Sequence, residues 1–124
     1  MRTPLFAGLA AAALASACLP AAAQMAPASH VASPGVYKVL QENSEMRVVL
    51  ATWKPGQRDE MHSHPSNVTY ALTPCHARLY GPDGKVLVES QRPQGSAVIQ
   101  SQIPAHSFEN IGSNECQILI VERK

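Results

Sequence analysis

From residue 36 onward the chain alternates short apolar runs with turn residues, and no stretch keeps a sustained helical period. Within these runs apolar and polar side chains alternate, which is typical of strands with one buried face. Turn signals divide the runs: Pro-Gly at 55–56, GPDG at 81–84, RPQG at 92–95 and IGSNE at 111–115. Many short strands at close spacing predict an all-β domain, either a sandwich or a closed barrel.

The same alternation predicts which side chains form the core. The expected core residues occupy every second position of two runs: Val68, Tyr70, Leu72, Ile118 and Ile120. Trp53 and Phe108 are expected to pack in this core rather than to form a ligand platform, because aromatic side chains supply much of the burial in a small domain.

The first 23 residues have the pattern of a signal peptide. Arg2 precedes a run rich in Ala and Leu, and Ala21–Ala23 offer a small-residue cleavage site before Gln24. We therefore expect export to the periplasm or the medium. A lipoprotein anchored through Cys18 is the alternative, although the Leu of LASAC stands one position too far upstream for the usual lipoprotein signal.

Residues 24–35 are rich in Ala, Pro and Ser and show no period of either kind. We expect them to form a flexible tether, with His30 in solvent. The folded domain is then expected over residues 36–124. Such a domain is near the lower size limit for a self-sufficient core, so a disulfide, a metal or a partner subunit is expected to add stability.

Charge excludes two classes of partner. The chain has 10 Lys and Arg against 9 Asp and Glu, and removal of the first 23 residues takes away one Arg and leaves a neutral chain. Without a basic surplus, neither a nucleic acid nor an anionic membrane surface is an expected partner.

Two histidines stand one residue apart in the sequence EMHSHPSNVTYAL. In a strand, positions i and i+2 share a face, so His62 and His64 are expected to aim at one region, with Ser63 pointing the other way. Two imidazoles alone are too few for a metal site. Strand parity also places Glu60 on this face as a weak candidate for a ligand or an acid-base group; the alternative is that Glu60 faces water where the strand begins.

A third histidine, His106, lies 42 residues downstream in the sequence IPAHSFENIG. Gly56 stands six residues before His62, and Asn110 stands four residues after His106. This arrangement resembles the two motifs of the cupin superfamily: a Gly, five residues, His-x-His and a later Glu, then a His followed by three residues and an Asn. The resemblance extends over about residues 36–124.

The resemblance implies a double-stranded β-helix, which is a jelly-roll barrel. It also implies that His62, His64 and His106 hold one divalent first-row metal, which could be Fe, Mn, Ni, Cu or Zn. The motif glutamate should fall at position 68 or 69, where this chain has Val68 and Thr69. The ligand set carried over is therefore confined to the three histidines.

Other polar residues are weaker candidates. Gln57, Tyr70 and Asn110 are candidate pocket groups, and Asn110 is equally expected to hold a turn. Arg78 is a cation on a neighbouring strand whose facing is open. The sequence contains no Gly-rich phosphate loop, no G-x-S-x-G and no C-x-x-C motif that would point to other chemistry.

The fold leaves the function open. Three-histidine cupins include iron-dependent thiol and diketone dioxygenases, so one hypothesis is an oxygenase-type enzyme acting on a small molecule. The alternatives are a non-catalytic module that binds a small ligand or a metal, and a structural cupin without metal. Related small cupins are often dimers, so the resemblance also implies a homodimer.

The resemblance finally implies a disulfide. Jelly-roll strand order brings the end of the strand near Cys75 next to the start of the last strand, near Cys116. In an oxidising compartment this arrangement favours a bond between the two.

Overall fold

The structure of the protein is a computed structural model that describes residues 25–124. The predicted signal peptide over residues 1–23 and Cys18 lie outside the described residues. One helical turn, α1 (Ser29–Ala32), precedes nine strands. The strands are β1 (Tyr37–Glu42), β2 (Met46–Trp53), β3 (His62–His64), β4 (Asn67–Ala71), β5 (Cys75–Tyr80), β6 (Val86–Arg92), β7 (Ala97–Gln100), β8 (Ile103–Asn110) and β9 (Cys116–Arg123).

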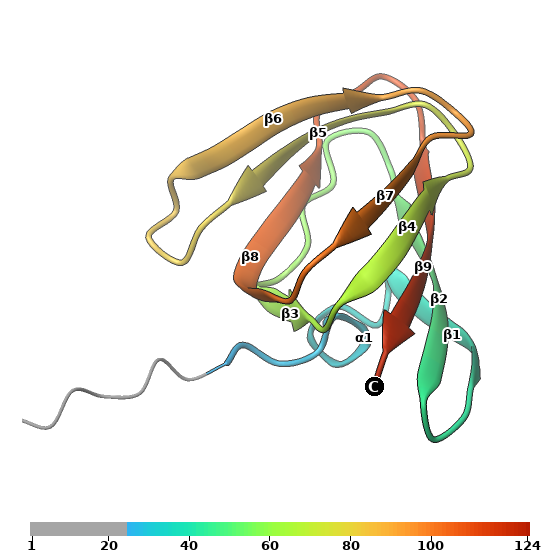
Figure 1. The fold of residues 1–124 in the computed structure, drawn as a ribbon. Helices are drawn as coiled ribbons and strands as arrows, with labels where there is room; N and C mark the ends of the chain where they lie inside the picture. Colours follow the sequence, from blue (N-terminus) through green and yellow to red (C-terminus); the bar gives the residue numbers. More distant parts are fainter. Residues whose placement is uncertain (1–24) are drawn as a thin grey trace, which may run out of the picture.

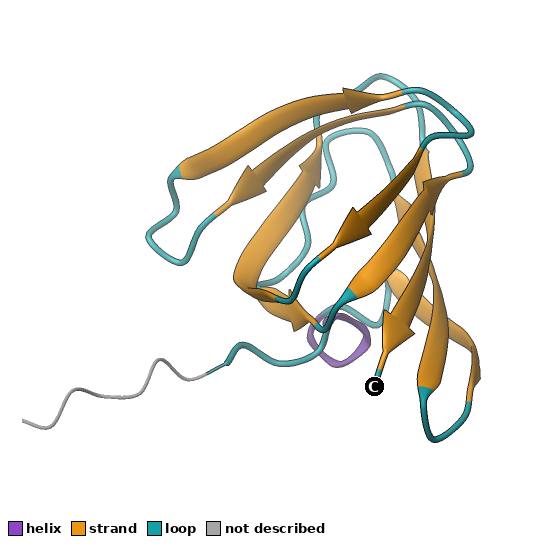
Figure 2. Ribbon diagram, in the orientation of Figure 1, coloured by secondary structure: helices purple, strands orange, loops and turns teal. Residues whose placement is uncertain are grey.

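The nine strands form two antiparallel sheets that face each other (Figure 1). One sheet has the order β1-β2-β9-β4-β7, and the other has the order β3-β8-β5-β6. Non-consecutive neighbours such as β2 with β9 and β3 with β8 give the crossed connections of a jelly roll. The predicted all-β jelly-roll fold is therefore confirmed, and Figure 2 shows that strands dominate the described chain.

The turn at Pro55-Gly56 brings the two sequence motifs together. Gly56 has φ of 75°, a left-handed conformation that side chains with a Cβ rarely adopt. In this conformation the Gly56 backbone N–H donates to the Asn110 backbone oxygen at 2.8 Å, and the Asn110 backbone N–H donates to the Gln57 backbone oxygen at 2.9 Å. The glycine of the first motif is thus bonded directly to the asparagine of the second.

The predicted disulfide between Cys75 and Cys116 is present, with Cα atoms 5.0 Å apart. Cys75 begins β5 and Cys116 begins β9, so the bond joins one sheet to the other. Both residues are buried in the hydrophobic core beside Trp53 and Ile118. The disulfide therefore acts as a covalent link across the core.

The prediction of inward-facing residues is half right. Ile118 and Ile120 are buried, but Val68 and Tyr70 are 42% and 45% exposed. Their neighbours Asn67, Thr69 and Ala71 face the interior instead. For β4 the alternation predicted the period correctly but the buried face wrongly. This strand turns its small side chains toward a cavity between the sheets and its large side chains outward. Leu72, which follows the strand, is half-buried.

Residues 25–35 are not the flexible tether that their composition predicted. Ala28 forms a parallel bridge with Ser63 of β3, and the Ser63 amide donates to Pro27 O at 2.8 Å. The Glu60 amide donates to Ser33 Oγ at 2.9 Å. This segment covers the outer edge of β3, as the position of α1 in Figure 1 shows, so unpaired backbone groups at that edge find partners.

His30 also differs from expectation, since its ring is half-buried and Nδ1 lies 3.5 Å from Arg47 Nη1. Within residues 25–124, no helix has the length and apolar character needed to cross a membrane.

Candidate metal centre

Three histidines from two neighbouring strands meet inside the barrel. His62 and His64 lie on β3, and His106 lies on β8. The pairing of these strands puts His62 opposite His106, while a local irregularity pairs His64 with Ile103. Directly opposed residues of an antiparallel pair share a face, so the register alone aims His62 and His106 at the same space.

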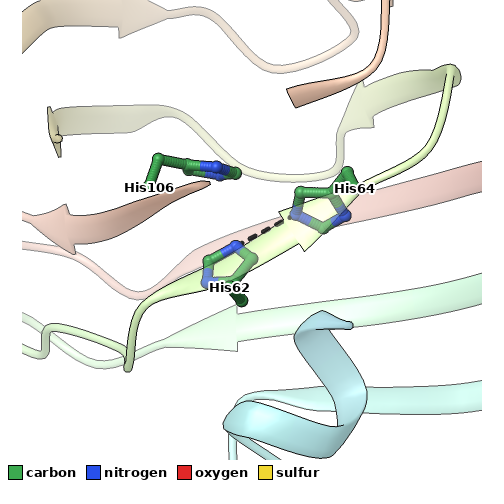
Figure 3. A group of neighbouring side chains, drawn as sticks. All are labelled: His62, His64 and His106. Atoms are coloured by element: carbon green, nitrogen blue, oxygen red, sulfur yellow. Dashed lines mark hydrogen bonds between the residues drawn. The ribbon is translucent and has the colours of Figure 1, made fainter. Parts of the chain in front are cut away.

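The three rings lie close together and are buried. His62, His64 and His106 are 0%, 5% and 3% exposed. Each offers one nitrogen, and these three atoms lie within 4.8 Å of one another. Figure 3 shows the rings turned toward one another, with His62 Nε2 and His64 Nε2 only 3.1 Å apart. Three buried histidines in this arrangement could hold a metal ion.

A fixed acceptor assigns the ring proton of His62. His62 Nδ1 lies 2.7 Å from the Glu60 carbonyl oxygen, which can only accept a hydrogen bond. Nδ1 must therefore carry the proton of the neutral ring, and its Nε2 presents a lone pair. The buried carboxylate of Asp59, 3.6 Å from the same Nδ1, favours the same tautomer.

His64 is held in the same way by a carboxylate. His64 Nδ1 donates to Glu122 Oε1 at 2.7 Å, and Glu122 itself is 1% exposed. Arg47 Nη1 lies 3.4 Å from the other carboxylate oxygen, so Glu122 bridges His64 and Arg47. His64 Nε2 is therefore also a lone-pair acceptor. A carboxylate behind an imidazole is the arrangement that orients many metal-binding histidines.

The Tyr37 hydroxyl oxygen adds a third lone pair, beside His62 Nε2. Tyr37 Oη donates to Asp59 Oδ2 at 2.7 Å and lies 3.0 Å from His62 Nε2. Trp53 Nε1 and the Phe108 amide also donate to Asp59, at 3.0 and 2.7 Å, so this carboxylate collects three donors. Burial, and then the neighbouring Asp59, raise the pKa of Tyr37 well above its usual value, so the phenol stays protonated.

These acceptors converge in a way that suits a cation. Two nitrogens bound to one ion at about 2.1 Å lie about 3.0 to 3.4 Å apart for angles of about 90 to 110°. The observed 3.1 Å between the two Nε2 atoms falls in this range. Without a cation or a proton between them, the two lone pairs repel each other in a buried space.

The electrostatics favour the neutral form of His62 and His106, which is the form that binds metal. Burial, and then the nearby His62 and His64, lower the pKa of His106 to about 3. Burial also lowers the pKa of His62, against the opposing effect of Asp59. His106 Nδ1 is buried and finds no hydrogen-bond partner among residues 25–124.

His64 and His106 open onto a cavity of about 90 Å³ between the two sheets. Its wall includes the aromatic residues Trp53 and Phe108, whose rings stack with centroids 4.1 Å apart. These two residues therefore pack in the core, as predicted, and also line the cavity. Thr69, one of the two positions at which the first motif would carry its glutamate, lines the same wall.

The weaker candidates from the sequence lie elsewhere. The Glu60 side chain is exposed, because β3 begins only at His62 and strand parity does not extend back to residue 60. Gln57 Oε1 accepts from the Lys54 amide, and Asn110 bonds within its own turn to Gly112 and Asn114. Arg78 pairs with the exposed Glu89. Ser63 points away from the rings, as expected, and donates to Ala26 O.

Sequence reasoning missed three residues of the site: Tyr37, Asp59 and Glu122. Glu122 had a usable signal, because it continues the inward alternation of Cys116, Ile118 and Ile120. Asp59 and Tyr37 had none, since the chain before β3 is irregular and Tyr37 is simply the first residue of its strand.

Comparison with solved structures places this architecture among cupins. A cupin domain from Bordetella pertussis Tohama I matches with a TM-score of 0.64 and 22% identity, over 80% of this chain and 96% of that one. A cupin superfamily protein from Desulfitobacterium hafniense DCB-2 matches with a TM-score of 0.53 and 9% identity, over 71% and 75% of the two chains. KdgF from Halomonas sp. matches with a TM-score of 0.50 and 15% identity, over 73% and 81%.

No protein-family model and no curated protein matches the sequence. At the identities of the structural matches, similarity establishes the fold alone. The chain therefore has the cupin fold that its motifs implied, and its chemistry has to follow from its own residues.

Proposed function

We propose that this protein of cupin fold binds one divalent first-row metal ion through His62, His64 and His106. The observation that carries the proposal is the convergence of lone pairs. The Nε2 atoms of His62 and His64 lie 3.1 Å apart, and the Nδ1–H of each of these two rings donates to a fixed oxygen. This is the donor set and the outer support that Fe, Mn, Ni, Cu and Zn accept in proteins.

The proposed role is that of an oxygenase-type enzyme acting on a small molecule. Three neutral histidines would leave coordination positions open, and the bound metal would supply Lewis-acid or redox chemistry there. The chain's own residues define the rest of the site. Tyr37 offers an oxygen beside His62, while Trp53 and Phe108 form an apolar wall that limits water.

A non-catalytic binding module is the second candidate, and the placement of the acids favours it. Among residues 25–124 the buried carboxylates are Asp59 and Glu122, which lie against the outer side of the histidine cluster and do not line the cavity. Neither is positioned to exchange a proton with a molecule in the cavity. The small cavity then serves to hold a ligand or the metal itself.

The test begins with elemental analysis of protein purified from the periplasm without chelator. The wild-type protein should carry one equivalent of metal, whereas His62→Ala, His64→Ala and His106→Ala should each lose metal affinity by at least about 100-fold and melt at a lower temperature. His76→Ala is the matched control, because His76 pairs with the exposed Glu89 outside the cluster.

Metal-free wild-type protein with unchanged melting of His106→Ala would refute the metal site. Oxygen consumption with a panel of thiols and diketones then separates the enzyme from the binding module. Turnover that requires the bound metal supports the enzyme, and ligand binding without turnover supports the module.

Export and self-association belong to the same proposal. The disulfide Cys75–Cys116 supports an oxidising compartment, as the predicted signal peptide requires. A homodimer is supported by exposed apolar residues on the outer face of the β1-β2-β9-β4-β7 sheet, where Ile99 is 86% exposed beside Val68 and Tyr70. Light scattering of the purified protein, with Ile99→Lys as the disrupting variant, measures whether this face associates.

A further inference from the structure

Arg92 reaches across the cavity from one sheet to the other. It ends β6 of the four-stranded sheet, and its guanidinium contacts β4 of the five-stranded sheet. Arg92 Nη1 donates to Thr69 Oγ1 at 2.9 Å, and Nη2 donates to Ser96 O at 3.1 Å and to Thr69 O at 3.4 Å. Arg92 lines the same cavity as His64 and His106.

No carboxylate of residues 25–124 pairs with the charge of Arg92. Arg47 and Arg78 each contact a carboxylate, but within residues 25–124 no carboxylate oxygen lies within 4.0 Å of the Arg92 guanidinium. Its Nε is buried and finds no hydrogen-bond partner in this part of the chain. Burial lowers the pKa of Arg92, yet a guanidinium stays charged at neutral pH.

The Arg92 guanidinium still has N–H groups that its contacts within residues 25–124 do not use. A guanidinium has about five N–H groups, and the contacts to Thr69 and Ser96 use three of them. A partly buried cation with free donors is costly for a folded protein unless an anion compensates it. Arg92 is therefore arranged to accept a negatively charged partner in the cavity.

The lining of the cavity carries no carboxylate that could serve as this partner. Besides the histidines and Arg92, the polar lining residues are Tyr37, Thr69, Ser90 and Gln100. Asp59 and Glu122 are outside the lining, behind the histidine cluster. A glutamate at position 69 would have placed a negative charge beside the guanidinium, whereas Thr69 supplies only a neutral hydroxyl.

We propose that the cavity binds a small carboxylate through Arg92, with the rest of the ligand in the space toward the metal centre. The inference rests on the proposed function only for the metal beside the ligand, and the Arg92 contact stands on its own geometry. The cavity of about 90 Å³ is far below the roughly 300 Å³ or more of sites for drug-sized ligands, so the ligand has only a few non-hydrogen atoms.

The test compares propionate with propionamide, which have the same shape but differ in charge. Both are titrated into zinc-loaded protein while NMR chemical shifts of the cavity residues are followed. Wild-type protein should bind propionate at least about tenfold more tightly than propionamide, the value of one or two hydrogen bonds to a charged group. Arg92→Gln should lose this preference and keep its zinc.

Arg78→Gln is the matched control, since it removes an arginine of the same sheet that pairs with Glu89 at the surface. Thr69→Glu is a second test that does not depend on the folding of Arg92→Gln. It places a carboxylate next to Arg92 and should also abolish the preference for propionate. Melting temperatures verify that each variant is folded.

The outcomes separate the two proposals. Equal affinity for the two probes in zinc-loaded wild-type protein, or a preference for propionate that survives Arg92→Gln or Thr69→Glu, overturns the carboxylate site and leaves the metal centre intact. Wild-type protein that takes up no metal refutes the proposed function. In that case the same titration of metal-free protein tests the carboxylate site. A preference for propionate that depends on Arg92 supports this site, and the lack of such a preference overturns it.

Discussion

Single hydrogen bonds decide what the histidines can do. His62 and His64 point into the same space, and in each ring the Nδ1–H donates a hydrogen bond to a fixed oxygen. The oxygen differs between them, since Glu60 contributes its backbone carbonyl and Glu122 its side chain. Only the second of these contacts can be removed by substitution, which makes Glu122 the residue through which the support of the cluster can be tested.

Glu122→Gln should weaken metal binding by about 10- to 100-fold, the usual effect of losing a carboxylate behind a metal-binding histidine. The amide can still accept from His64 Nδ1, but it lacks the charge that makes the ring a stronger donor to metal. Competition with a chromophoric chelator measures the affinity. Glu115→Gln, at an exposed position, should leave affinity unchanged; equal loss in both variants would show that Glu122 has no special role.

The stability of the metal-free protein should fall as pH drops from 7 to 5. The folded pKa of His106, about 3, lies below the unfolded value of about 6.5, so the unfolded chain binds more protons in this range and acid favours unfolding. At pH 5 the expected loss is about 2 kcal/mol from this residue. Urea unfolding across this range measures it, and His106→Gln should have a flatter pH dependence. An equally steep dependence in the variant would assign the effect to other groups.

Among the elements, β3 depends most on its surroundings, because three residues cannot form a stable strand alone. Its inner edge pairs with β8, and its outer edge is covered by residues 25–35. The metal-binding proposal places two of its three ligands on this strand. The N-terminal segment is therefore expected to support the site without contacting it.

Ser33→Ala combined with Ser63→Ala should loosen this cover. The substitutions remove the hydrogen bonds from the Glu60 amide to Ser33 Oγ and from Ser63 Oγ to Ala26 O. Each loss is expected to cost about 1 to 3 kcal/mol, since it leaves a partner group unpaired. Urea unfolding measures the stability, and hydrogen exchange at the His62 and His64 amides should become faster. Ser113→Ala, at an exposed position, is the control, and unchanged exchange in the double variant would contradict the supporting role.

On the scale of the whole molecule, the two sheets are held together by a small core and one covalent bond. The disulfide closes a loop with a sequence separation of 41 between β5 and β9. Cys116 begins β9, whereas Glu122, which supports His64, lies near the other end of that strand. The main effect of the disulfide falls on the unfolded chain rather than on the histidines. Stability and metal binding should therefore respond differently to its loss.

Cys75→Ala combined with Cys116→Ala should lower the free energy of unfolding by about 4 kcal/mol, the chain-entropy value for a loop of this length. Metal affinity of the folded double variant should change by less than about threefold, because the histidine contacts do not involve either cysteine. Urea unfolding and chelator competition measure the two quantities. A large loss of affinity with little loss of stability would reverse this assignment.

Local patterns in the sequence determined the period of the strands, the turns and the pairing of the motifs. Alternation is a property of the extended backbone, and Pro-Gly at 55–56 is a local turn signal, so both are visible without a fold. The histidine spacing and the cupin resemblance then identified His62, His64, His106 and the cysteine pair, which the structure brings together as expected.

Only the tertiary structure decided which face of a strand is buried and which charges meet. Val68 and Tyr70 alternate like core residues but point outward, because the cavity requires small side chains on the inner face of β4. Glu122 lies 58 residues from His64, and Arg92 meets Thr69 across two sheets. Such contacts arise from the packing of distant strands, and no local period encodes them.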